Sequence, residues 1–407
     1  MRKPEGVAEA ANDALHRLAT ALVDSASLVR AVPERLRVAP VEGVSPASVP
    51  ALRSLLDRLT DALELPRLDV VPEPARLWSV ELALSRRLML GSGGLDAVAG
   101  SSARPGPGEA EGVEDIARSA SAALPGRPVV VRAYDGSPLR CWTAGREGLP
   151  AVALVTACGM PVGLVTRWMK ALSGSFRVVT WESRGLFAAE NGAGPAALGD
   201  HSLAAQAGDL PAVLDGFGIR RAHTMGLCGG AAIALAAAST SARVMSLSLW
   251  HGDYELGGAA PKTDHQRDVQ SLLAMASRNL RQAAGLHRLM RRRSALDGMR
   301  PDIAHHLIHP YATPDLLHRY GLLNGAIMAT DCRPFLAAGQ PALVVSSPKD
   351  TTAHPAGSEY VATRLPRADL RMLPEGDHLS AFDAGPELVR LAEEFLHDVT
   401  ATHRKDT

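Results

Sequence analysis

The segment GLCGG at residues 226–230 constrains the fold of this chain more than any other part of its sequence. Residues 221–226 are typical of a short strand, and residues 231–239 are a run of small helix formers. Glycines on both sides of one side chain allow a strand and a helix to meet at a tight, strained turn. The pattern predicts a strand–turn–helix with Cys228 at its apex, although a buried structural cysteine in a glycine-rich turn would have the same pattern.

The composition is that of a globular protein without a strong charge preference. The 407 residues include 43 basic and 43 acidic side chains, so no net charge attracts nucleic acid or an anionic membrane. Charged residues interrupt the first 30 positions, and no apolar run is long enough to cross a bilayer. The four cysteines are widely spaced and form no CxxC pair. We expect a cytoplasmic protein with reduced thiols, no metal or cofactor, and no nucleic-acid or membrane partner.

The first part of the chain, residues 1–110, is predicted to be a helical region that ends in a linker. Apolar side chains at helical spacing predict helices over 7–23, 45–63 and 74–90. Residues 91–112 are rich in Gly, Ser, Ala and Pro, which is typical of a flexible linker.

The second part, residues 111–407, is predicted to be an α/β domain. Its expected strands are 129–133, 139–143, 151–156, 177–181, 221–225, 244–250, 342–346 and 370–373. Helical segments fall between the later strands, so we expect a mostly parallel eight-stranded sheet with helices on both faces. Residues 255–335 interrupt the alternation, and we predict that they form a helical cap over the carboxyl ends of the strands, where such sheets bind ligands.

Two further motifs precede the turn. Residues 158–161 read CGMP after the third strand, and residues 182–185 read ESRG after the fourth. Together with GLCGG, they resemble the α/β-hydrolase family over roughly residues 127–400. The first is similar to the family's His-Gly-x-Pro oxyanion segment, with cysteine in place of histidine, and the second is similar to its Asp-x-Arg-Gly turn. The resemblance implies the α/β-hydrolase fold and makes GLCGG a nucleophile elbow with cysteine where serine is usual.

The same resemblance implies a catalytic triad of Cys228, Asp350 and His378. A thiol reacts as its thiolate, and a neighbouring histidine is the usual means of removing its proton. His378 lies just past the last predicted strand, where the family places its base. Asp350 follows the seventh strand and would hold the imidazole tautomer. Asp253, after the sixth strand, is the alternative acid, because some members of the family use that position.

The backbone amides of Gly229 and Met160 are the expected oxyanion donors. The first follows the nucleophile directly, and the second belongs to the segment that resembles the family's oxyanion loop. Cys158, in the same segment, is expected to shape the loop rather than to act as a second nucleophile.

Cysteine changes the expected chemistry, because the covalent intermediate becomes a thioester. The elbow and triad are similar to those of polyhydroxyalkanoate synthases and dienelactone hydrolase, but the linker and cap match neither pattern. We expect cysteine-dependent acyl transfer or thioester hydrolysis through acyl-Cys228, on a CoA- or carrier-bound acyl group in a specialised bacterial pathway. Ester or lactone hydrolysis, and a non-catalytic binding protein with this fold, are the alternatives.

Three other features have more than one interpretation. Arg291 and Arg292 belong to a basic run in the predicted cap, which would be either a solvated face or a contact for the phosphates of a CoA or carrier arm. His305 and His309 share a helical face, but without a suitably spaced carboxylate we prefer a polar helix to a metal site. The apolar faces of the N-terminal helices must be buried against the chain itself, a second copy in a homodimer, or a partner.

Overall fold

The computed structural model describes residues 5–40, 49–74, 77–89, 112–123, 125–187 and 197–405. The chain forms two compact units, each with its own core. Unit 1 contains the described residues up to Arg127 together with Ala284–Pro314, and unit 2 contains the others from Pro128 onward. Except for Gly112, the predicted linker lies outside the described residues.

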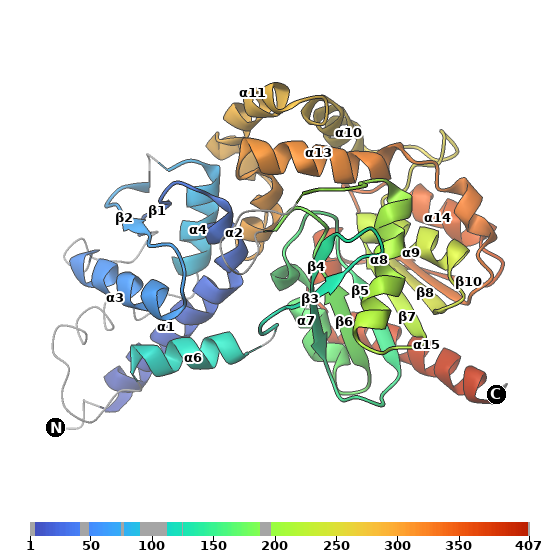
Figure 1. Cartoon of the computed structure of the whole chain (residues 1–407), viewed down its shortest axis with the longest axis horizontal. Coiled ribbons are helices and arrows are strands. Elements are labelled where there is room, and N and C mark those ends of the chain that lie inside the picture. Colours follow the sequence, from blue (N-terminus) through green and yellow to red (C-terminus); the bar gives the residue numbers. More distant parts are fainter. Residues whose placement is uncertain are drawn as a thin grey trace. The chain divides into compact units, whose positions relative to one another are not determined.

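Unit 2 is built on an eight-stranded sheet with the order β10-β9-β8-β7-β5-β6-β4-β3 (Figure 1). The strands are β3 (Val129–Arg132), β4 (Pro138–Ala144), β5 (Ala151–Val155), β6 (Arg177–Trp181), β7 (Ala222–Leu227), β8 (Val244–Trp250), β9 (Ala342–Ser346) and β10 (Ala368–Met372). All eight coincide with predicted strands to within a few residues. β4 is antiparallel to β3 and β6, and the other neighbours run parallel, so the predicted mostly parallel sheet is confirmed.

Helices cover both faces of this sheet. One face carries α7 (Thr166–Leu172) and α15 (Pro386–Lys405), and the other carries α8 (Leu203–Gly216) and α9 (Gly229–Thr240) (Figure 1). Every residue of β5, β7 and β9 is buried, which explains why these strands are mostly apolar. α14 (Pro355–Arg364) packs on β9 and β10.

The parallel strands all end at one edge of the sheet, where their connecting loops converge. The order reverses between β5 and its neighbours β6 and β7, which is the position at which such sheets bind ligands. Two helices of the predicted cap, α10 (Asp264–Ala276) and α13 (Pro314–Ala329), belong largely to unit 2. They pack on each other, with His318 Nδ1 2.8 Å from the carbonyl oxygen of Ala276.

Unit 1 is mainly helical, as predicted for the N-terminal region. It contains α1 (Glu5–Asp24), α2 (Ala26–Ala31), α3 (Val49–Ala62), α4 (Ser79–Met89), α6 (Val113–Ala122) and a two-stranded parallel sheet of β1 (Arg37–Val38) and β2 (Asp69–Val70). α6 packs against α1 and α3. Each of the three helices contributes an almost completely buried side chain: Leu18 from α1, Leu56 from α3 and Ile116 from α6. Each such side chain stabilises the unit by about 1.5–3 kcal/mol. The apolar stripes of these helices thus find partners within the unit.

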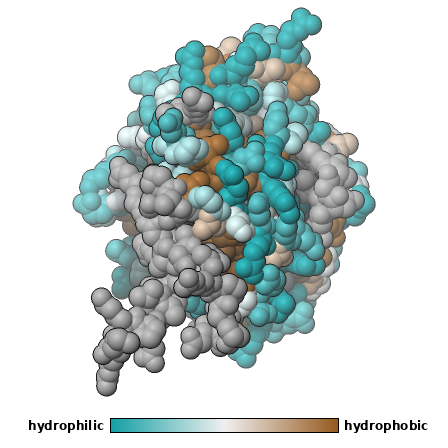
Figure 2. All heavy atoms as spheres, turned by 90° about the vertical axis from the view of Figure 1, so that its left-hand side faces the viewer, coloured by the Kyte–Doolittle hydropathy of each residue, from teal (hydrophilic) through white to brown (hydrophobic). Residues whose placement is uncertain are grey.

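The surface in Figure 2 is mostly hydrophilic, with apolar side chains gathered in a strip between hydrophilic ones. Within the described ranges, no helix combines the length and apolar character that crossing a membrane requires.

The segment Ala284–Pro314 joins unit 1 although it lies within the predicted cap. It contains the end of α11 (Leu280–Met290), α12 (Ala304–Leu307) and the 3-10 turns Arg293–Leu296 and His309–Tyr311. Asp24, the last residue of α1, accepts hydrogen bonds from His305 (3.0 Å) and Arg87 (2.8 Å) and lies 3.2 Å from the ring nitrogen of His306. The cap predicted over 255–335 is therefore divided between the two units.

This cluster also changes the interpretation of the histidine motif. α12 is one turn long, and His309 belongs to the following 3-10 turn, so His305 converges with His306 rather than with His309. The guanidinium of Arg87 already neutralises the carboxylate that the two histidines approach. We interpret the group as a polar link between α1, α4 and α12.

Candidate active site

The GLCGG segment forms the predicted strand–turn–helix. Cys228 lies between β7 and α9 with φ 55° and ψ −126°, a left-handed conformation that is unusual for a residue with a side chain. A Cβ on Gly226 would lie 2.5 Å from the carbonyl oxygen of Gly230, and one on Gly230 would lie 2.3 Å from that of Val155. The two glycines therefore let the strand and helix approach closely enough to present Cys228 at the turn.

The structure brings the three predicted triad residues together at the carboxyl ends of β7, β9 and β10. His378 Nδ1 lies 2.9 Å from Asp350 Oδ2, and both side chains are almost completely buried. Cys228 is partly exposed, and its sulfur interacts with the ring of His378. Because Nδ1 is engaged by the carboxylate, Nε2 is the ring nitrogen left for the thiol. This is the order of contacts that nucleophile–base–acid catalysis requires.

Asp350 is held by four hydrogen bonds. Its Oδ1 accepts the backbone N–H groups of Thr352 (2.8 Å) and Ala353 (2.9 Å). Its Oδ2 accepts from His378 and from a second histidine, His251, whose Nδ1 lies 2.8 Å away. These donors outweigh the burial of the carboxyl group and lower its pKa well below the usual value, so Asp350 is an anion at neutral pH.

The charges around His378 favour its protonated form. Burial disfavours the imidazolium, but the Cys228 thiolate and the Asp350 carboxylate outweigh it and raise the pKa of His378 to about 10. The other three cysteines differ, because burial raises the pKa of Cys141, Cys158 and Cys332 to about 12. Cys228 is therefore the cysteine with a built-in base.

Replacing His378 with glutamine is expected to slow alkylation of Cys228 by iodoacetamide at pH 7 by about tenfold or more, since the thiolate loses its counter-charge. Intact-mass spectrometry gives the rate and shows whether a single thiol reacts. His265→Gln is the matched control, because His265 is an exposed histidine of α10 whose ring makes no bond to Cys228. Equal rates in the two variants would contradict the pairing.

Of the two predicted oxyanion donors, one is free and one is engaged. Gly229 is the first residue of α9, and its buried N–H group has no acceptor among the residues that the structure describes. The N–H of Met160 instead donates to the carbonyl oxygen of Ala157 (3.1 Å), because Gly159, with φ 80°, closes a turn there. Of the expected donors, Gly229 is therefore available in this structure, whereas the N–H of Met160 is engaged within its own turn.

The alternative acid, Asp253, is directed elsewhere. Its Oδ1 accepts a hydrogen bond from Gln266 Nε2 (2.6 Å), and desolvation raises its pKa. Its backbone N–H lies 3.4 Å from the carbonyl oxygen of Cys228. The carboxylate that bonds His378 is that of Asp350.

Sequence reasoning missed the residues that hold the oxyanion segment. Ser183 Oγ accepts the N–H of Gly159 (2.9 Å), and Glu182 Oε1 accepts that of Val162 (3.0 Å). Both acceptors belong to the ESRG motif, whose Arg184 is buried in an ion pair with Asp209. The motif was recognised by resemblance, but its contact with the oxyanion segment depends on the packing of β5 beside β6.

Two side chains of α13 lie against the same backbone segments. The ring of Tyr320 lies 2.7 Å from where a Cβ of Gly159 would be, and Asn324 Oδ1 lies 3.5 Å from that position on Gly229. Asn324 Nδ2 donates to the Tyr320 hydroxyl (3.0 Å). This cap helix therefore forms one wall of the site.

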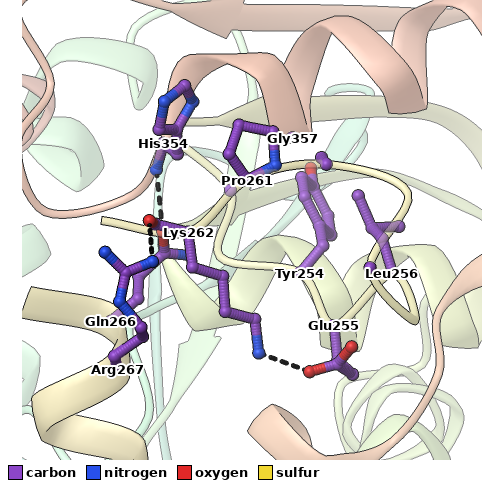
Figure 3. Close-up of a pocket in the computed structure, with 12 residues that line it drawn as sticks. Tyr254, Glu255, Leu256, Pro261, Lys262, Gln266, Arg267, His354 and Gly357 are labelled. Atoms are coloured by element: carbon purple, nitrogen blue, oxygen red, sulfur yellow. Dashed lines mark hydrogen bonds and ion pairs between the residues drawn. The ribbon is translucent and has the colours of Figure 1, made fainter. Parts of the chain in front are cut away.

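A cavity of about 310 Å³ lies beside the loop that follows β8 (Figure 3). The two cations that line it are paired, Lys262 with Glu255 and Arg267 with Asp264. The buried Tyr254 hydroxyl, on the same wall, has no hydrogen-bond partner within the described part of the chain. The cavity lining is thus mixed in polarity, with two cations and one anion, Glu255.

The predicted phosphate contacts belong to unit 1. Arg291 stacks on the ring of Trp78, with its guanidinium carbon 4.6 Å from the ring centroid, and Arg292 precedes a 3-10 turn. This stacking gives Arg291 a structural partner within its own unit.

No protein-family model matches the sequence. Among solved structures, the chain is similar to an enol-lactonase from Burkholderia xenovorans LB400, with 22% identity and a TM-score of 0.53 over 66% of this chain and 100% of that one. It is also similar to a hydrolase from Pseudomonas aeruginosa PA01, with 25% identity and a TM-score of 0.50 over 67% and 98% of the two chains.

A thermophilic esterase from Thermogutta terrifontis matches with 17% identity and a TM-score of 0.52, over 67% of this chain and 99% of that one. The matches cover about two thirds of this chain, and identities this low establish the fold but not the reaction. This chain itself has a mostly parallel eight-stranded sheet and a tight turn at Cys228 between β7 and α9. This protein therefore has the α/β-hydrolase fold.

Proposed function

We propose that this protein transfers or hydrolyses acyl groups through a thioester on Cys228. The observation that carries the proposal is the arrangement of Cys228 beside His378, which is in turn bonded to Asp350. The cysteine occupies a strained backbone conformation, and the carboxylate is buried. A structural cysteine would need neither the left-handed backbone nor a base beside it.

In the first half-reaction, His378 Nε2 removes the thiol proton and the thiolate attacks the acyl carbonyl carbon. Negative charge develops on the carbonyl oxygen, and the free N–H of Gly229 is placed at the start of α9 to stabilise it. Collapse of the tetrahedral intermediate breaks the bond to the leaving group, which takes the proton from His378. The enzyme is left as acyl-Cys228 with a neutral imidazole.

In the second half-reaction, the neutral His378 removes a proton from the acceptor as it attacks the thioester. Water as acceptor gives hydrolysis, whereas an amine, alcohol or thiol gives transfer. The expelled Cys228 sulfur regains the proton from His378. Asp350 holds the proton of His378 on Nδ1 through both steps and balances the charge of the imidazolium each time it forms.

The cysteine favours thioester donors. A cysteine thiolate is a good leaving group from the intermediate and exchanges acyl groups readily with other thiols, so a CoA- or carrier-bound acyl group is the proposed donor. The cavity beside the β8 loop is the proposed site for part of the substrate, because the backbone N–H of Asp253 in that loop contacts the carbonyl oxygen of Cys228 at the elbow. A role for Arg291 and Arg292 in binding the donor's phosphates, and a homodimer through the N-terminal helices, remain predictions.

Mixing the protein with a panel of acyl-CoA thioesters is expected to add one acyl mass to the chain. Intact-protein mass spectrometry measures the adduct, and peptide mapping locates it on Cys228. Cys228→Ala is expected to lose it, and Cys158→Ala is the matched control, because Cys158 is buried with a raised pKa. A wild-type chain without adduct over the whole panel, or an adduct that survives in Cys228→Ala, would contradict the proposal.

Ester or lactone hydrolysis is the second candidate, because an esterase and an enol-lactonase are among the similar structures. Adding amines or alcohols to the acylated enzyme separates the two: acyl transfer diverts the product, whereas simple hydrolysis does not. A non-catalytic binding protein would show neither an adduct nor turnover.

A further inference from the structure

The carboxylate of Asp350 serves two histidines instead of one. His251 Nδ1 lies 2.8 Å and His378 Nδ1 lies 2.9 Å from the same oxygen, Oδ2. The two rings are nearly perpendicular, with an angle of 82° and a centroid separation of 5.7 Å. Asp350 is an anion and can only accept, so both Nδ1 atoms carry a proton.

The other ring nitrogen of His251 lies away from any hydrogen-bonding group among the described residues. Nε2 is buried and has no hydrogen-bond partner among the described residues, and the side chain is 1% exposed. A proton there would create a buried cation with an unsatisfied donor, which is costly. His251 therefore serves Asp350 as a donor through Nδ1 alone, whereas His378 can exchange its Nε2 proton with Cys228.

The backbone holds His251 in this position at a cost in conformational energy. Its φ is 48°, a left-handed value that is unusual for a histidine, directly after β8. Its N–H donates to the carbonyl oxygen of Val345 in the neighbouring β9 (2.8 Å). Strain of this kind persists where the surroundings require the conformation, and here it directs the ring at Asp350.

We propose that His251 is a positioning residue that holds Asp350 and shares its charge, so that His378 releases its proton readily when Cys228 carries an acyl group. A donor that occupies Oδ2 permanently reduces the negative charge available to the imidazolium of His378. The second half-reaction needs a neutral His378, so this sharing favours deacylation. The inference rests on the proposed function for the step that it affects.

Other charged groups around His378 set the background for this effect. They are the thiolate of Cys228 at the start of α9, Asp253 in the loop after β8 and His265 of α10. Within the described residues, the side chain of His251 hydrogen-bonds Asp350 and not Cys228, so its influence on the thiol passes through Asp350.

The test measures the His378 titration without the thiolate. In a Cys228→Ala background, NMR of ¹³C-labelled histidines gives the titration of His378, which is assigned by its loss in His378→Gln. His251→Asn keeps an N–H donor at the position of Nδ1 and tolerates the left-handed backbone, whereas His251→Leu has a similar shape without the donor. Thermal unfolding of each variant is recorded alongside.

His251→Leu is expected to raise the pKa of His378 by about one unit, because Asp350 regains its full charge for the imidazolium. His251→Asn is expected to leave it within about 0.3 units of the parent. If the leucine variant does not fold, His251→Gln, whose amide lies one bond further along the side chain, replaces it with the same expected direction. An unchanged titration without the donor, or an equal rise with asparagine, would overturn the role of His251.

This titration needs no acyl donor. An absent acyl-Cys228 adduct therefore rejects the proposed function alone, whereas a normal adduct with an unchanged titration rejects the role of His251 alone.

Discussion

Replacing Asp350 with asparagine is expected to lower acyl turnover by about 10⁴-fold, the loss known when a triad aspartate becomes asparagine. The amide would donate to Nδ1 of His378 and so favour the tautomer that places a proton on Nε2, where the thiol must be deprotonated. The substitution also removes the charge that balances the imidazolium. Steady-state turnover of the acyl donor that forms the Cys228 adduct measures the effect.

Asp253→Asn is the matched control, because Asp253 is the other candidate for the acid of the triad. Its carboxylate bonds Gln266 and not His378, so turnover is expected to fall by less than about tenfold. Intact folding of both variants is checked by thermal unfolding. A larger loss in Asp253→Asn than in Asp350→Asn would assign the acid to the loop after β8 instead.

Replacing Gly230 with alanine is expected to destabilise unit 2 by about 3 kcal/mol, at the upper end of the cost of overpacking. The new Cβ would lie 2.3 Å and 2.6 Å from the carbonyl oxygens of Val155 and Thr156, which are backbone atoms at the end of β5 and cannot move without displacing the strand. Denaturant unfolding, followed by the fluorescence of the buried Trp168 and Trp250, reports on this unit.

Gly229→Ala provides the comparison at the adjacent position of the same helix. Its Cβ would meet only Asn324 Oδ1, at 3.5 Å, which is an ordinary contact. Alanine also favours a helix over glycine by up to about 1 kcal/mol, so the stability is expected to change by less than that amount. Equal destabilisation by the two substitutions would show that the close approach of α9 to β5 is not the reason why position 230 requires glycine.

Much of the fold of unit 2 could be predicted because its signals are local. The runs that became β5, β7 and β9 are short and mostly apolar, as is typical of strands buried on both faces. The turn at Cys228 was predictable for the same reason, since adjacent glycines mark a close backbone approach. His378 and Asp350 could be placed because each follows a strand, and the carboxyl ends of parallel strands share one edge.

The domain boundary was harder to predict. The segment that contains α12 reads as part of the insertion after β8, yet His305 bonds Asp24, which lies 281 residues earlier in the chain. No spacing rule relates two positions so far apart. The predicted cap over 255–335 is divided at Ala284, and the part from there to Pro314 is held in unit 1 by this polar cluster together with buried apolar side chains such as Ile303 and Ile308.

The sequence by itself determined the order of strands and helices, the strained turn at Cys228 and the positions of Asp350 and His378 at strand ends, because each depends on neighbouring residues. Only the tertiary structure decided the hydrogen bonds between distant loops. It placed His251 on Asp350, 99 residues away, and it engaged the N–H of Met160 in a local turn. Such contacts depend on how the strands are ordered and how closely the loops pack, which residue types and spacing do not specify.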